Sequence, residues 1–328
     1  MKKIDKILLI SVIILSLFGL LMIYSSSSIW ATYKYNDPYK YLKSQAIFLI
    51  LGYFIIFITS KVDYHLYKKY SNHILIISII LLILVLIPGI GTIRNGSRSW
   101  FGIGSFGIQP SEFAKLGLII FTSKYLTRNK IKDIKSSVLP ILLIVLLIFG
   151  LIMLQPDFGT GVIIVITIVA LLFVSGVNMS FFIKIGLLGL IGVVILVIIA
   201  PYRLERITSF LNPWKDPLGS GFQIIQSMYA IGPGGLLGMG LGNSIQKHFY
   251  LPEPQTDFIF SIISEELGFA GILIVTTLFI TIIYRSITIS IKQEDNFAKY
   301  LSFGITFSLA FQTLLNLMVV VGLIPVTG

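Results

Sequence analysis

Long runs of apolar residues, separated by short polar segments, make up most of the 328-residue chain. An α-helix rises about 1.5 Å per residue and the hydrocarbon core of a bilayer is about 30 Å thick, so roughly 17–25 apolar residues suffice to cross it. The pattern predicts an all-α polytopic membrane protein, with a single membrane domain over residues 1–328. We expect nine membrane helices, near residues 7–27, 45–60, 74–91, 111–126, 137–154, 160–176, 181–200, 257–284 and 299–322.

Composition agrees with this pattern, since 55% of the residues are hydrophobic and 12% are charged. Soluble domains usually carry about 25% charged residues. The chain has no cysteine, which excludes disulfides and thiolate metal sites. The basic residues before Ile7 and the following apolar run lack a clear small-x-small cleavage site, so we interpret this segment as a first membrane helix.

The net charge of +11 does not indicate a nucleic-acid partner, because the basic residues lie mainly between hydrophobic spans. With the N-terminus inside, the inner segments hold 15 lysines and arginines and the outer segments hold 9. Basic residues mark the cytoplasmic side of membrane proteins. We therefore expect a cytoplasmic-membrane protein with its N-terminus inside and its longer polar loops outside. Contact with anionic lipid head groups is a lesser consequence of the same placement.

Three of the four polar outer segments precede the middle of the chain. The first, residues 25–43, is rich in aromatic residues, which are typical of a membrane interface. The second, residues 94–115, reads as a glycine- and serine-rich loop followed by a helix on which Glu112 and Lys115 can pair at i,i+3. The third, LQPDFGTG at 154–161, breaks a helix at Asp157, and a capped turn and a ligand-binding role are both open.

The fourth and largest outer segment is the loop at 201–256. Gln223, Gln226 and Tyr229 are spaced to share one face of a short helix. The glycine-rich stretch at 232–242 lacks the residue order of a phosphate-binding loop. We expect it to be a flexible amphipathic segment on the outer leaflet.

The stretch LPEPQTDFIFSIISEELG, residues 251–268, starts as a polar loop and is expected to continue without a break into an apolar helix. Asp257 should lie in the first turn, after a capping Thr256, where helix N–H groups favour an anion. At about 100° per residue, Glu265 lies about 80° around the helix from Asp257 and Glu266 about 180°. We therefore expect Glu266 to pack against a neighbouring helix.

Several of these sequence stretches resemble those of the SEDS family of shape, elongation, division and sporulation proteins, whose branches are FtsW, RodA and SpoVE. The resemblance is carried by NGSRSW…QPSEFAK, LQPDFGTG and the stretch from Arg203 to Gly268, and it is closer to the SpoVE and FtsW branches. It implies that Asp257 is the residue required to polymerise lipid II. It also implies a tenth helix after the final LIPVTG, so the chain is expected to lack a C-terminal part. The resemblance makes the following residues candidates for substrate binding: Arg94, Arg98, Gln109, Glu112, Lys115, Asp157, Arg206, Gln223, Gln226 and Glu265.

The function that follows is a peptidoglycan glycosyltransferase acting on the outer face of the membrane. Asp257 would serve as base or would help to hold a divalent cation, magnesium or manganese, and no organic cofactor is expected. Expected partners are a class B penicillin-binding protein, lipid II, the growing glycan strand, membrane lipids, and divisome or sporulation proteins at the septum or forespore. A lipid II flippase and a scaffold for the penicillin-binding protein are the alternatives, because broken helices and intramembrane charges also suit a transporter.

Overall fold

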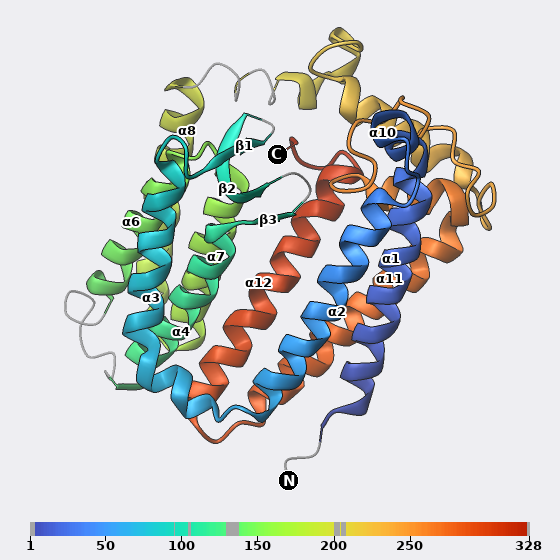
Figure 1. Ribbon diagram of the computed structural model, residues 1–328. Coiled ribbons are helices and arrows are strands. Elements are labelled where there is room, and N and C mark those ends of the chain that lie inside the picture. The colour runs from blue at the N-terminus through green and yellow to red at the C-terminus, as the bar shows by residue number, and fades with distance from the viewer. Residues whose placement is uncertain are drawn as a thin grey trace. The chain divides into compact units, whose positions relative to one another are not determined.

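The computed structural model describes residues 4–94, 96–103, 106–128, 138–199, 204 and 208–326. These residues form two compact units, and long helices run from one unit into the other (Figure 1). Unit 1 contains residues 1–57, 190–285 and 313–327, and unit 2 contains residues 58–189 and 286–312.

Unit 1 is built from long helices and the large loop that precedes the last two of them. Its elements are α1 (Lys6–Tyr35), most of α2 (Lys40–Lys61), the end of α8 (Met179–Ile199), η1 (Pro213–Lys215), α10 (Phe222–Ile231), η2 (Gly232–Gly234), most of α11 (Ile259–Ile291) and the end of α12 (Asn296–Val320).

Unit 2 combines a helical bundle with a small sheet. Its complete elements are α3 (Tyr64–Leu86), β1 (Thr92–Arg94), β2 (Ser97–Ile103), β3 (Phe106–Ile108), α4 (Pro110–Arg128), α6 (Leu139–Met153) and α7 (Phe158–Val174), and it also holds the start of α8 and of α12.

The predicted membrane helices are confirmed as helices within the described residues. Five of them, α1, α2, α3, α11 and α12, are long and apolar enough to cross a membrane. Helices α6 and α7 are apolar but shorter, as is the described apolar part of α8. Helix α4 carries charges at both ends, which include Glu112 and Arg128. The fold class of an all-α polytopic membrane protein is therefore correct.

The expected first outer loop, residues 25–43, is wrong over most of its length. Helix α1 continues through its serines to Tyr35. The side chains of Ser26 and Thr32 donate hydrogen bonds to the carbonyls of Met22 and Ser28, both at 2.8 Å, so these hydroxyls are satisfied inside the helix. The helix ends only at Asn36, which adopts a left-handed conformation with φ 53°.

The segment before α4 is a sheet, which the sequence pattern did not indicate. Strands β1, β2 and β3 pair antiparallel in chain order, with Phe101 opposite Ile108. Glycines and serines dominate this segment, and they weaken both the alternation and the β-propensity by which a strand is recognised. The sheet leads directly into the N-terminus of α4.

Each unit has its own apolar core. In unit 2, fully buried side chains from α3, α4, α6 and α7 pack together, for example Leu82, Leu118, Ile148 and Leu171. In unit 1, Met22 of α1 packs with Ile262 of α11 and Val320 of α12. Lipid tails are as apolar as leucine, so close packing rather than removal from water holds such helices together.

Candidate active site

Asp257 lies two residues before α11, which begins at Ile259. The side chain of Asp257 is exposed, whereas the next residue, Phe258, is buried in the core of unit 1. The backbone carbonyl of Asp257 accepts a hydrogen bond of 3.1 Å from Nδ2 of Asn316 on α12. The Asp257 carboxylate thus lies just before the first turn of a membrane helix. Its backbone is fixed by the hydrogen bond from Asn316 and by the buried neighbour Phe258.

The predicted position of Asp257 in the first turn of the helix, after a capping Thr256, is wrong. The hydroxyl of Thr256 donates back to the carbonyl of Glu253, at 3.2 Å, and closes a turn there. Glu253 itself has a positive φ of 49°, so the chain is still turning at this point. Because the side chain of Thr256 is used in that turn, the helix begins three residues after it.

Although Asp257 is accessible to solvent, the protein atoms around its carboxyl partly desolvate it and raise its pKa above the ordinary value of 3.8. No helix N–H group or cation offsets this effect among the causes of the shift. A carboxylate with a raised pKa is a stronger base than an ordinary aspartate.

Two buried glutamates on α11 hold the loop that leads to Asp257. Glu265 accepts hydrogen bonds from the hydroxyl of Ser244 at 2.5 Å and from the backbone N–H of Ile245 at 2.9 Å. Glu266 forms an ion pair of 2.8 Å with Lys247, and the side chains of these two residues are 0% and 4% exposed. A carboxylate in such surroundings is stable only when its charge is paired and its oxygens accept hydrogen bonds.

The Glu266 carboxylate also reaches α1. The hydroxyl of Ser25 lies 2.8 and 2.6 Å from its two oxygens. Helix α1, helix α11 and the loop are therefore joined at one buried carboxylate, which confirms the expectation that Glu266 contacts a neighbouring helix. Glu265 was expected to bind substrate, but the structure buries it and uses its oxygens to hold the loop.

Helix α11 is interrupted at Gly268, which has φ 60° and ψ −154°. The expectation of an unbroken helix after residue 257 is therefore wrong. The glycine-rich loop docks on the break: the N–H groups of Met239 and Gly240 donate to the carbonyls of Glu265 and Glu266, both at 2.9 Å. A Cβ atom on Gly268 would lie 2.4 Å from the backbone nitrogen of Gly238, so only glycine fits there.

This docking corrects the picture of a flexible segment at 232–242. The N–H groups of Phe269 and Ala270 also donate to the carbonyls of Gly235 and Leu236, at 2.9 and 3.1 Å. Backbone groups released by the helix break are thus satisfied by the loop, as backbone at membrane depth requires. Leu236 and Leu237 of this segment are exposed, and its place on the outer leaflet stays a prediction.

Unit 2 brings four of the predicted substrate residues into two polar pairs. Nε2 of Gln109 donates to Asp157 at 2.8 Å, and Asp157 also caps α7 by accepting from the N–H of Thr160 at 3.1 Å. One turn into α4, Lys115 and Glu112 form an ion pair of 2.8 Å, as their spacing predicted. Lys115 also donates to Gln312 of α12 at 2.9 Å, a partner that sequence spacing does not indicate.

The two arginines of the sheet contact different elements, Arg94 the sheet and Arg98 the end of α3. The guanidinium of Arg94 lies 5.0 Å from the centre of the Trp100 ring, a cation–π contact. Arg98 donates to the carbonyl of Leu86, at 3.4 Å. Neither contact uses all the donors of a guanidinium group, which carries five N–H bonds.

The remaining candidates belong to the large loop. Gln223 and Gln226 lie on α10, partly exposed, while Ile224 and Ile225 are buried on its other face, so the predicted polar face is confirmed. Arg206 lies outside the described residues. Within the part of the chain that the structure describes, no three His, Asp or Glu side chains are grouped as a metal site would require.

The fold and the buried carboxylate network define a polytopic membrane protein with an exposed acid at a helix mouth, and comparison with known proteins identifies its family. The model of the cell cycle proteins FtsW, RodA and SpoVE matches residues 5–328. The chain is 50% identical over 326 residues to stage V sporulation protein E of Bacillus subtilis, covering 99% of this chain and 89% of that protein. It is 39% identical over 326 residues to a probable peptidoglycan glycosyltransferase FtsW of a Geobacter species, with the same coverage of 99% and 89%.

Two solved structures share the fold. One, from work on the structural coordination of polymerization and crosslinking by a peptidoglycan synthase complex, has a TM-score of 0.81 at 30% identity and covers 100% of this chain and 90% of its own. The other, rod shape determining protein RodA of Thermus thermophilus, has a TM-score of 0.71 at 27% identity and covers 98% of this chain and 86% of its own. The chain belongs to the FtsW/RodA/SpoVE family.

Proposed function

We propose that this chain is a peptidoglycan glycosyltransferase that polymerises lipid II on the outer face of the cytoplasmic membrane. Family membership and the glycosyltransferase names of relatives such as FtsW support this activity. The assignment of the site rests on the surroundings of Asp257. Its carboxylate is exposed and has a raised pKa, and it lies at the end of a loop that two buried glutamates hold in place.

In the proposed reaction, Asp257 accepts the proton of the acceptor sugar's 4-hydroxyl. That oxygen forms a new bond to C1 of the donor sugar, and the bond between C1 and the pyrophosphate oxygen breaks. Undecaprenyl pyrophosphate leaves with the electron pair, and the proton stays on the Asp257 carboxyl. A positioned general base contributes roughly 10²–10⁴-fold to such a transfer. Attack opposite to the leaving group inverts the configuration at C1.

Arginine is the residue best suited to the pyrophosphate, because its planar fork pairs with two oxygens at once. Arg98 donates one hydrogen bond, to the backbone, and its other N–H groups suit this role. We assign substrate roles also to Arg94, to Arg206, and to the glutamines of α10. In the pairs Gln109–Asp157 and Glu112–Lys115 the polar groups already bond to each other, so a substrate that contacts them would find these hydrogen bonds made.

A divalent cation held by Asp257 stays the alternative to the base role, and no three His, Asp or Glu side chains of the described residues are grouped around such an ion. Asp257 is a single carboxylate, and the oxygens of Glu265 and Glu266 accept hydrogen bonds within the protein. The steps above take Asp257 as the base. If chelation with EDTA abolished polymerisation, Asp257 would instead be assigned to cation binding.

A penicillin-binding partner and a place at the septum or forespore belong to the same proposal. The structural neighbour from a complex that coordinates polymerization with crosslinking supports a transpeptidase partner. The apolar helices support a membrane location, and the excess of basic residues in the predicted inner segments supports an N-terminus on the inside. The similarity to stage V sporulation protein E favours a sporulation role over a division role.

The proposed activity is tested with fluorescent lipid II in detergent, where no bilayer separates two compartments and flipping leaves no signal. The purified chain is mixed with its penicillin-binding partner, whose crosslinking is blocked with a β-lactam, and the partner alone is the control. Glycan polymer that requires this chain supports the enzyme. No polymer, with a verified partner and a working positive control, would favour the scaffold, or the flippase if the chain moved lipid II across proteoliposomes.

A further inference from the structure

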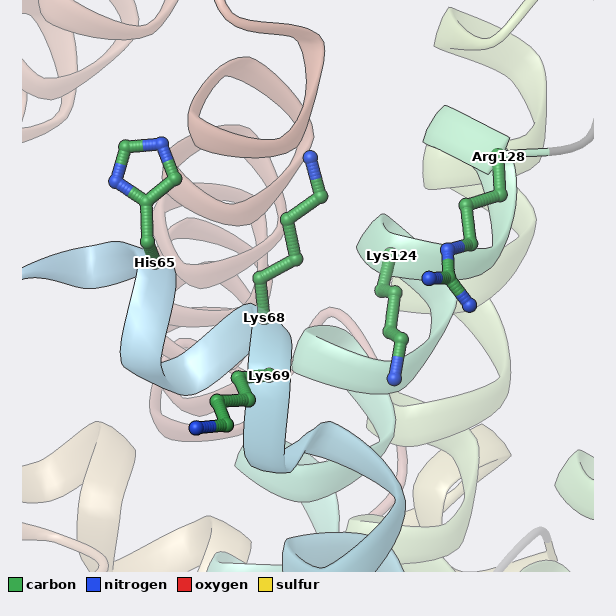
Figure 2. A pocket seen from close by; sticks show the side chains of 5 residues that line it. All are labelled: His65, Lys68, Lys69, Lys124 and Arg128. Carbon is green, nitrogen blue, oxygen red and sulfur yellow. The ribbon is translucent and has the colours of Figure 1, made fainter.

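At one end of unit 2, five side chains that can carry positive charge line a cavity of about 330 Å³. His65, Lys68 and Lys69 come from the first turns of α3, and Lys124 and Arg128 come from the last turns of α4 (Figure 2). The sheet and the Gln109–Asp157 pair lie at the other ends of these two helices. The cavity is therefore a separate feature from the polar groups described above.

Four of the five charges around this cavity form no ion pair with an acid in the part of the chain that the structure describes. These four are Lys68, Lys69, Lys124 and Arg128. The acids Asp63 and Asp295 lie at this end of the helices and are bonded elsewhere. The carboxylate of Asp63 lies 2.7 Å from Nδ1 of His65, and that of Asp295 accepts hydrogen bonds from the N–H groups of Phe297 and Ala298. Four cations around one small cavity repel one another, so an anion bound among them stabilises the protein.

The contacts of these side chains hold them near the cavity. Nζ of Lys68 lies 5.5 Å from the centre of the buried Phe297 ring on α12. Nζ of Lys124 donates to Oδ1 of Asn72, the next turn along α3, at 3.2 Å. Lys124 and Arg128 are like charges at i,i+4 on one helix, an unfavourable spacing in the absence of an anion.

We propose that this cavity binds the phosphate of an anionic phospholipid head group. The cavity lies at the start of α3, a helix that is long and apolar enough to cross a membrane, so it lies where lipid head groups are found. Its volume is at the lower end of the range for ligand pockets. Basic pockets between membrane helices bind such head groups, and the sequence pattern places this end on the cytoplasmic side. Lysines placed only to set membrane orientation need not converge from two helices on one cavity.

The test is a titration of the purified full-length chain with phosphatidylglycerol, followed by native mass spectrometry, with phosphatidylcholine as the uncharged comparison. The pocket variant is Lys68→Gln/Lys124→Gln/Arg128→Gln. The matched control, Lys6→Gln/Lys184→Gln/Lys292→Gln, removes three exposed charges elsewhere. We expect Kd for phosphatidylglycerol to rise at least about tenfold in the pocket variant and less than about twofold in the control.

Equal losses in the two variants, or no loss in the pocket variant, would overturn the proposal. The charge-retaining variant Lys68→Arg/Lys124→Arg should bind like the wild type, and a loss there would contradict an electrostatic site. A parallel titration with inorganic phosphate separates the two sources of the anion. If phosphate raised the melting temperature of the wild type but not of the pocket variant, while both bound phosphatidylglycerol equally, the ligand would be free phosphate and not a lipid.

Discussion

Removing the charge of Lys247 tests whether the buried carboxylates of α11 hold the loop that leads to Asp257. In Lys247→Met the side chain keeps its length and loses its ammonium group, so Glu266 is left with Ser25 and the more distant N–H of Ser244 as partners. Breaking a buried ion pair on one side costs about 3–5 kcal/mol, because the remaining charge stays buried without its partner.

This cost should appear first as local opening of the loop. Since about 1.4 kcal/mol corresponds to a factor of ten, a loss of about 3 kcal/mol makes opening about 100-fold more frequent. The assay is hydrogen–deuterium exchange of the amides of residues 244–246, two of which donate to Glu265. We expect these amides to exchange about 100-fold faster in the variant, with the amides of unit 2 unchanged.

The matched control is Lys43→Met, which removes the lysine of an exposed pair with Asp37 in the same unit. Exposed pairs contribute less than about 1 kcal/mol. In Lys43→Met the exchange rates of the amides of residues 244–246 should therefore change less than about fivefold. In the double variant Lys247→Met/Glu266→Leu the charge of Glu266 is removed together with its lysine partner, and much of the protection should return. If residues 244–246 exchanged within threefold of the wild-type rate in Lys247→Met, the ion pair would not be what holds the loop.

Three further results are expected. Gly268→Ala should lower the melting temperature strongly, because its Cβ would meet Gly238, whereas Gly52→Ala in the open part of α2 should leave it nearly unchanged; equal melting temperatures would contradict the docked break. Polymerisation should fall as pH falls through the raised pKa of Asp257, since only the ionised carboxylate accepts a proton, so the acidic limb of the pH–rate profile should lie above 3.8. Asp157→Ala should destabilise the protein by about 1 kcal/mol through loss of the α7 cap, whereas Asp157→Asn, which still caps, should cost less in a denaturation series; equal losses would argue against the cap.

The helices could be predicted from the sequence because their signal is local. A run of apolar residues long enough to cross a bilayer leaves little choice of structure. The pairing of Glu112 with Lys115 and the polar face of α10 follow from the same helical spacing. The continuation of α1 through its serines did not follow, because those hydroxyls can bond either to the helix or to a loop.

The loop contacts could not be predicted, because they join residues far apart in the chain. Lys247 and Glu266 are 19 residues apart, and Ser25 and Glu266 are 241 apart. The only local signal was the pair of adjacent glutamates in an apolar helix, which indicated that partners were needed without naming them. The break at Gly268 likewise depends on a loop that approaches from about 30 residues upstream.

In the proposed reaction the carboxylate of Asp257 accepts the proton during glycan polymerisation. The most direct measurement compares initial rates of lipid II polymerisation by the wild type and by Asp257→Asn, with Asp216→Asn as a second exposed acid of the same loop that should retain activity. Hydrogen exchange confirms that each variant keeps the protected loop. We predict a loss of at least about 100-fold for Asp257→Asn alone. Equal rates for the wild type and a folded Asp257→Asn would contradict the account.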